Sequence, residues 1–283
     1  MSAVWTIAVY ALREALRRKV FVVVLILTAA FLGLYWLGAV QAFQETDELI
    51  APTGVDAQTL AGATLFGLSM FGTLFLGTVL AVFLTLGAVR GDAERGLLQP
   101  LVVRPLGRST FLVARFLGAA AICVLYVLVV YAAAAVITHN AGGWWPDRFV
   151  IPGLELAAGV VVIAALSLLG SVLLSATANG IAVFMIFGAG LVAGLLGQIG
   201  EALGSETLRS VARTTSWILP FEALYQDGLN RITADSAGFT EFALQLGPFG
   251  GAQAGGGMLP LWSLLYLLAV GALALTLFAR KDL

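Results

Sequence analysis

Cysteine and histidine, which often act as nucleophiles, bases or metal ligands, are scarce in this sequence. Its 283 residues include one cysteine and one histidine. Cys123 lies in a long apolar stretch, and a single cysteine can form neither an intramolecular disulfide nor a cysteine-based metal site. His139 is the single histidine, so the sequence cannot supply a metal site built from several histidines. We therefore expect no metal ion on this chain.

Ser69 stands in "GLSM", a Gly-x-Ser-x pattern that is similar to the one in intramembrane serine proteases. Such a serine needs a base from another span, and His139 lies in a segment that we expect outside the membrane. A serine that packs between helices explains the pattern more simply. An intramembrane serine protease is kept as a disfavoured alternative.

The sequence also lacks the residues of a nucleotide-binding phosphate loop. A phosphate-binding loop needs a lysine after a glycine-spaced turn. The two lysines, Lys19 and Lys281, follow "LRR" and "FAR" instead. We expect no cofactor on this chain and no ATP hydrolysis by this route.

The elements that position these residues are apolar helices. The chain is 60% hydrophobic and 11% charged, and a charge at the bilayer centre costs roughly 2.5 to 3.5 kcal/mol. About 20 helical residues cross the hydrocarbon, and the longest uncharged block is divided by a polar turn in "SATANG", residues 175–180. The sequence predicts an all-α membrane protein with one transmembrane domain over residues 1–283. Its six spans are expected at about 20–42, 63–89, 113–137, 153–175, 180–199 and 258–279.

The orientation follows from lysine and arginine, which gather on the cytoplasmic side of membrane proteins. With both termini in the cytoplasm, eleven of the fifteen basic residues fall inside. These are Arg13, Arg17, Arg18, Lys19, Arg90, Arg95, Arg104, Arg108, Arg115, Arg280 and Lys281. The net charge of −1 gives no indication of a nucleic-acid partner.

Residues 3–19 have the periodicity of an amphipathic helix. Trp5 begins an apolar stripe, and Arg13, Arg17 and Arg18 lie toward the polar side. Such a helix is typical of the membrane interface. The alternative is a basic flank of the first span that is merely helical.

The long outer loop, residues 200–257, contains the apolar piece "WILPFEALYQDGL" from Trp217. This piece is too short to span a bilayer, and Pro220 suits the start of a helix. We expect it in the outer interface or as a short re-entrant helix, with a disordered loop as the alternative.

Two glycines in the fifth span could pack against a second copy of the chain. Gly190 and Gly194 form a Gly-x-x-x-Gly pair, which lets two helices approach closely. The chain has 33 glycines, so such pairs also arise by chance.

Residues 90–108 are unusually charged for this chain. They contain a short amphipathic segment, which is broken at Pro105 and Gly107 and carries the apolar Leu97, Leu98 and Leu101. A segment of this kind suits docking on a soluble partner. A basic loop that rests on lipid headgroups is the alternative reading.

The run "RGDAERGLLQPLVVRPLGRSTFLVARFLG", from Arg90 to Gly118, resembles the cytoplasmic loop of type-2 ABC transporter permeases. The segments "LPFEALY" and "FARKDL" also resemble that family. The likeness is greatest to the multi-span permease type that serves nitrous-oxide reductase maturation. Leu97 stands where this loop commonly has threonine.

The resemblance implies a coupling helix that docks on a separate ABC ATPase. Two permease copies, here a homodimer, and two ATPases would form an exporter, with ATP and magnesium bound by the ATPases. The implied ATPase contacts are Asp92, Glu94, Arg95, Leu98, Arg104 and Arg108. Arg13, Arg17 and Arg18 would support them from the interfacial helix. The implied location is the plasma membrane, or inner membrane, of a bacterium or archaeon, and an ion-coupled secondary transporter is the main alternative.

Overall fold

The computed structural model describes residues 19–48, 56–86, 108–235 and 252–280, and every regular element in these ranges is helical. Six helices are long and apolar enough to cross a membrane, which confirms the predicted all-helical protein with six candidate spans. They are α2 (Lys19–Glu48), α3 (Ala57–Thr85), α6 (Arg108–Gly142), α7 (Val150–Leu173), α8 (Ala176–Ala202) and α12 (Leu259–Ala279). Two shorter helices are α9 (Glu206–Ile218) and α10 (Pro220–Arg231).

Two helices form the centre of the bundle. Within the 18-residue apolar stretch of each helix, 67% of the residues are buried in α3 and in α7. The share is 17% in α2, 28% in α8 and 22% in α12. The outer three helices therefore leave most of their apolar side chains uncovered by this chain. In a bilayer such surfaces face lipid or another membrane chain.

The peripheral helix α2 is tied to α6 by two hydrogen bonds between buried hydroxyls. The Thr28 hydroxyl lies 2.5 Å from the Tyr126 hydroxyl, and the Tyr35 hydroxyl lies 2.5 Å from that of Thr138. Hydroxyl pairs between helices satisfy polar groups that the hydrocarbon cannot. They give a sparsely buried helix a defined position.

The turn between α7 and α8 comes earlier than the Asn-Gly pair suggested. α7 ends at Leu173 and α8 begins at Ala176, so Asn179 is already helical. Its backbone N–H donates to the Ser175 carbonyl, the first bond of a new helix. Its side-chain amide donates to the Ser167 carbonyl at 2.9 Å, and Gly170 leaves room for it. Asn179 thus joins α8 to α7 instead of turning the chain.

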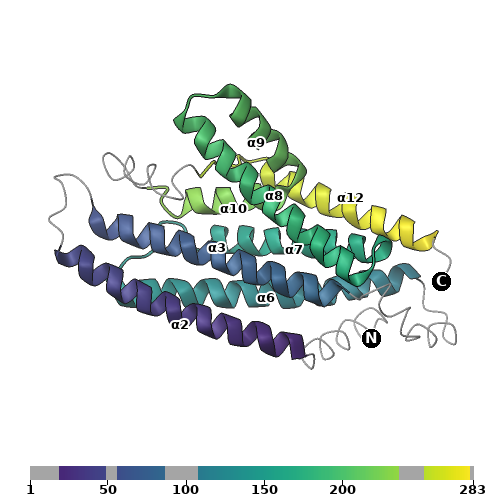
Figure 1. Cartoon of the computed structure of the whole chain (residues 1–283), viewed down its shortest axis with the longest axis horizontal. Coiled ribbons are helices and arrows are strands. Elements are labelled where there is room, and N and C mark those ends of the chain that lie inside the picture. Colours follow the sequence, from purple (N-terminus) through teal and green to yellow (C-terminus); the bar gives the residue numbers. More distant parts are fainter. Residues whose placement is uncertain (1–18, 49–55, 87–107, 236–251, 281–283) are drawn as a thin grey trace.

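The bundle has two different ends (Figure 1). At one end α2, α6 and α8 begin and α3, α7 and α12 end. The other end carries α9 and α10, and we call these two helices the cap. Basic residues occur at both ends. Lys19, Arg108, Arg115 and Arg280 lie in or beside helix ends at the end opposite the cap, and Arg148, Arg209, Arg213 and Arg231 lie at the cap end.

The Tyr35–Thr138 contact can be measured with a double-mutant cycle. We expect Tyr35→Phe and Thr138→Val to show a coupling energy of about 0.6 kcal/mol, and no more than about 1.7 kcal/mol, as for other hydrogen bonds within membranes. The free energy of unfolding of the purified chain gives the value. In a control cycle, Tyr35→Phe and Thr85→Val should be additive to within about 0.5 kcal/mol. Additivity in both cycles would contradict the hydrogen bond.

Candidate functional site

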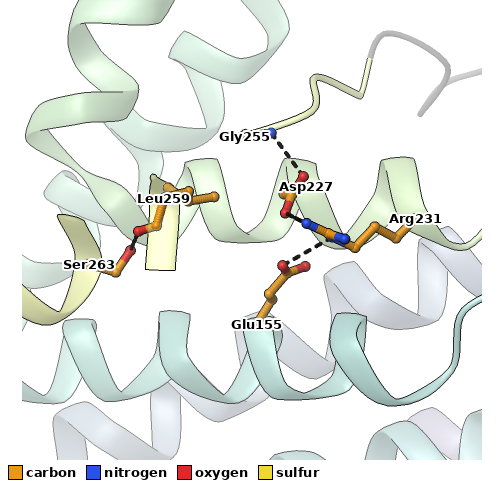
Figure 2. Close-up of polar contacts among 6 residues, drawn as sticks. All are labelled: Glu155, Asp227, Arg231, Gly255, Leu259 and Ser263. Atoms are coloured by element: carbon orange, nitrogen blue, oxygen red, sulfur yellow. Dashed lines mark hydrogen bonds and ion pairs between the residues drawn. The ribbon is translucent and has the colours of Figure 1, made fainter. Parts of the chain in front are cut away.

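Three charged side chains meet where the cap packs on α7 (Figure 2). Glu155 comes from the second turn of α7, and Asp227 and Arg231 come from α10. The exposed fractions of Glu155 and Asp227 are only 6% and 2%. Buried charges are rare unless they are paired. We call these three residues the charge cluster.

Arg231 holds the charge cluster together. Its Nε and Nη2 atoms donate to Asp227 Oδ2 at 2.9 and 2.8 Å. Its Nε atom also lies 3.2 Å from Glu155 Oε1, on the neighbouring helix. A planar guanidinium with several donors suits this arrangement better than an ammonium group would. One side chain therefore joins α10 to α7.

Asp227 extends the connection to the chain that leads into α12. Its Oδ1 atom accepts a hydrogen bond of 2.9 Å from the Gly255 N–H (Figure 2). Asn230 adds a second tie, because its side-chain amide donates to the Ala252 carbonyl at 3.2 Å. The charge cluster thus connects α7, α10 and the approach to α12.

Local sequence explains where α10 begins and ends, and α10 packs closely on α7. Pro220 occupies the first turn, where its missing N–H costs nothing, and Arg231 in the last turn complements the helix dipole. A Cβ added at Gly159 of α7 would lie 3.4 Å from the Phe221 carbonyl oxygen. A Cβ at Gly228 would lie 3.5 Å from Glu155 Oε2. Both distances are ordinary van der Waals contacts, so α10 packs closely on α7 at these two positions.

The electrostatics favour an ionised Asp227–Arg231 pair. Burial alone would raise the pKa of Asp227, but its contacts with Glu155, the Gly255 N–H and Arg231 outweigh burial and hold that pKa below its usual value. The hydrogen bond to Asp227 is the main cause of a raised pKa at Arg231. Two carboxyl groups face one guanidinium, so the cluster carries an excess negative charge when both are ionised.

A third buried carboxyl lies on another face of α10. Glu222 is 2% exposed, and its Oε1 atom accepts a hydrogen bond of 2.8 Å from the Gln226 amide. Burial raises the pKa of Glu222 to about 7, although the hydrogen bond from Gln226 opposes the shift. Its Oε2 atom has no hydrogen-bond partner within the described ranges.

The glycine pair of the fifth span faces the cap of the same chain. A Cβ at Gly190 would collide with the Phe221 ring, and a Cβ at Gly194 would collide with the Glu222 carboxyl. The pair therefore accommodates α10. Its role in packing against a second copy stays a prediction.

Most of the other residues singled out in the sequence lie outside the described ranges. This holds for Asp92, Glu94, Arg95, Leu98 and Arg104 of the loop, and for Trp5, Arg13, Arg17 and Arg18 of the expected interfacial helix. Arg108 is the first residue of α6. α10 coincides with the apolar piece expected to form a short helix, and its depth in the membrane stays a prediction.

The structure gives Ser69 a packing role. It is fully buried, and its hydroxyl donates to the Phe66 carbonyl of its own helix at 2.7 Å. The ring of His139 lies instead against Trp145, with 5.7 Å between ring centroids. Within the part of the chain that the structure describes, no three His, Cys, Asp or Glu side chains gather as a metal site would require.

The charge cluster was not predicted from the sequence, although one pattern in the sequence indicates part of it. Asp227 and Arg231 are four residues apart, a spacing at which opposite charges meet on one helix face. The contact between Glu155 and Arg231 joins distant segments, and spacing along the chain gives no sign of it.

The sequence of this chain matches a known family and two curated relatives. The profile of the family described as "ABC-2 family transporter protein" matches residues 5–283. Two curated relatives, from Pseudomonas aeruginosa and Stutzerimonas stutzeri, are each named "Probable ABC transporter permease protein NosY". They are 32% and 31% identical to this chain over 136 residues, which make up 48% of this chain and 45% of each relative. The chain therefore spans about half the length of the curated relatives it matches.

Removing the guanidinium of the charge cluster should destabilise the cap. We expect Arg231→Ala to lower the free energy of unfolding by about 3 kcal/mol, because two buried carboxyl groups lose their counter-charge. Arg148→Ala is the matched control, since Arg148 pairs with Asp235 at 3.6 Å on the surface, and it should change stability by less than about 0.5 kcal/mol. Equal effects of the two variants would show that the cluster does not hold the cap.

Glu222 should make stability depend on pH. Its raised pKa means that the folded chain binds the proton more tightly, so this contribution is present below about pH 4.5 and is lost as the pH rises through about 7. Arg213 lines the same cavity as Glu222, and burial together with the Glu222 charge raises the pKa of Tyr225. Relative to Glu222→Gln, we expect wild type to lose roughly 2 to 4 kcal/mol between about pH 5 and pH 8. Thermal unfolding measures this, with the exposed Glu206→Gln as control, and parallel curves for wild type and Glu222→Gln would contradict it.

Proposed function

The chain belongs to the ABC-2 transporter family, and from this membership we propose that it is the membrane-spanning subunit of an ATP-driven exporter. The observation that carries the proposal is the extent of the family match, which covers residues 5–283 and so includes all six apolar helices. The family membership confirms the resemblance read from the loop sequence. The permease names of the two curated relatives support the same role.

ATP would be hydrolysed on a separate polypeptide. Both lysines lack the glycine-spaced context of a phosphate loop. We place the contact with the ATPase in the loop of residues 90–108, and ATP and magnesium on the ATPase. The contact residues proposed are Asp92, Glu94, Arg95, Leu98, Arg104 and Arg108.

The orientation proposed puts the cap outside the cell. Of the fifteen basic residues, eleven belong to the termini, the 90–108 loop and the helix ends opposite the cap, and four to the cap end; basic residues mark the cytoplasmic side. Both termini and the 90–108 loop then lie in the cytoplasm, in the plasma membrane of a bacterium or archaeon. α10 would lie on the outer side, in the interface or as a short re-entrant helix. The interfacial helix of residues 3–19 would lie near the loop on the inner side.

Export would need movement to pass from the inner loop to the outer side. α3 and α7 are the most buried helices, and the Thr85 hydroxyl donates to Ser167 Oγ at 2.6 Å near their inner ends. At the other end of α7, Arg231 binds Glu155 and Asp227. We propose that α7 transmits displacement to the cap through this charge cluster. The sparsely buried α2, α8 and α12 offer surface for a second copy in a homodimer.

The coupling role predicts the effect of a charge reversal in the loop. We expect Glu94→Arg combined with Arg95→Glu to reduce co-purification of the ATPase to background, because both charges of the docking surface change sign. The measurement is the amount of ATPase, and its activity, recovered with the affinity-purified chain. Glu206→Arg with Arg209→Glu is the matched control, since this acid-base pair lies on α9.

Membrane insertion should be the same in both double variants. Unchanged ATPase recovery from the Glu94/Arg95 variant would count against the coupling role. Transport by the purified chain that depends on protons or sodium, and not on ATP, would favour the ion-coupled alternative.

A further inference from the structure

A cavity of about 280 Å³ lies between α8, the cap and the start of α12. Its walls include Gly194 of α8, Arg213 and Trp217 of α9, Glu222 of α10 and Gln253 ahead of α12. The charge cluster is not part of these walls. The cavity is therefore a second polar site in the cap, with its own residues.

The wall formed by α10 contains hydrogen-bond acceptors without donors. Glu222 Oε2 and Gln226 Oε1 are buried, and in the described ranges neither has a hydrogen-bond partner. A buried carboxyl without its full set of partners costs free energy. With Glu222 ionised both atoms are acceptors, so a ligand that satisfies them must bring N–H or O–H donors.

The wall formed by α9 contributes a cation, Arg213. The Arg213 side chain is exposed, and it has no hydrogen-bond or ion-pair partner among the residues described. A guanidinium of this kind binds phosphate or carboxylate through paired hydrogen bonds. The cavity thus offers a negative or acceptor wall and a separate positive wall.

Trp217 indicates the depth of the cavity in the membrane. Its ring lies 5.5 Å from that of Trp262, and Trp262 Nε1 donates to the Trp217 carbonyl at 2.9 Å. Tryptophans favour the headgroup level of the bilayer, where one side is apolar and the other wet. The molecules most abundant at this level are phospholipid headgroups.

We propose that this cavity binds a phosphoethanolamine group, with its ammonium on Glu222 and Gln226 and its phosphate on Arg213. The ammonium supplies three donors to the two unpaired acceptors, and the phosphate accepts from the guanidinium. The group has about eight non-hydrogen atoms, and the cavity holds the equivalent of roughly nine waters at about 30 Å³ each, so its size suits the group. The same chemistry occurs in a phospholipid headgroup and in soluble glycerophosphoethanolamine. This site does not depend on ATP coupling.

Calorimetric titration of the full chain in detergent tests the site. We expect sn-glycero-3-phosphoethanolamine to bind at least tenfold more tightly than sn-glycero-3-phosphate, which lacks the ammonium. Glu222→Gln and Arg213→Gln should each weaken binding of the first compound by about tenfold or more. Glu206→Gln and Arg148→Gln are matched controls outside the cavity, and both should bind as wild type does.

A second experiment, with lipid, distinguishes the two sources of the phosphoethanolamine group. The chain is incorporated into nanodiscs of equal phosphatidylethanolamine and phosphatidylglycerol, extracted, and the retained lipid is quantified by mass spectrometry. Enrichment of phosphatidylethanolamine in wild type that is lost in Glu222→Gln and in Arg213→Gln assigns the site to lipid. Binding of sn-glycero-3-phosphoethanolamine in the titration, without lipid enrichment, assigns it to a soluble ligand. Equal binding of the two titrants, or unchanged binding in Arg213→Gln, overturns the proposal. The exposed Arg213 makes that variant informative even where Glu222→Gln fails to fold.

Discussion

The bridge that Arg231 makes between Glu155 and Asp227 is the interaction on which the cap depends. A helix of twelve residues such as α10 is marginal in isolation and depends on tertiary contacts, among them the burial of Phe221, Leu224 and Leu229. The guanidinium fixes it on α7, and Asp227 uses its second oxygen to hold the chain before α12. Because α7 is also among the most buried helices of the bundle, the cap is attached to the centre of the molecule and not to its periphery.

The same physical rule explains the rest of the polar pattern. In hydrocarbon no water can satisfy a polar group, so most hydroxyls in the spans pair with one another or with backbone carbonyls. The Thr28–Tyr126 and Tyr35–Thr138 pairs follow this rule. Glu222 and Gln226 depart from it, since each keeps one unpaired buried oxygen within the described residues. Unpaired buried oxygens that line a cavity can accept hydrogen bonds from a ligand.

Sequence reasoning succeeded where the signal was length and hydropathy. Six apolar stretches of the right length predicted six spans, and Pro220 marked the start of α10. The division between α7 and α8 was placed slightly late, because Asn179 is used for a contact with Ser167 and not for a turn. The contact of Glu155 with Arg231 depends on how distant helices pack, which no local pattern records. The loop of residues 90–108 is assigned from charge and family resemblance.

Our central proposal is that the loop of residues 90–108 and the cap lie on opposite sides of the membrane. The most direct measurement uses a Cys123→Ala background, since Cys123 is the one native cysteine, with Ser210→Cys in α9 or Arg95→Cys in the loop. Both variants are treated with a membrane-impermeant maleimide in intact and in lysed spheroplasts. The account predicts that residue 210 is labelled in intact spheroplasts and residue 95 only after lysis. Labelling of residue 95 in intact spheroplasts, with residue 210 protected, would contradict it.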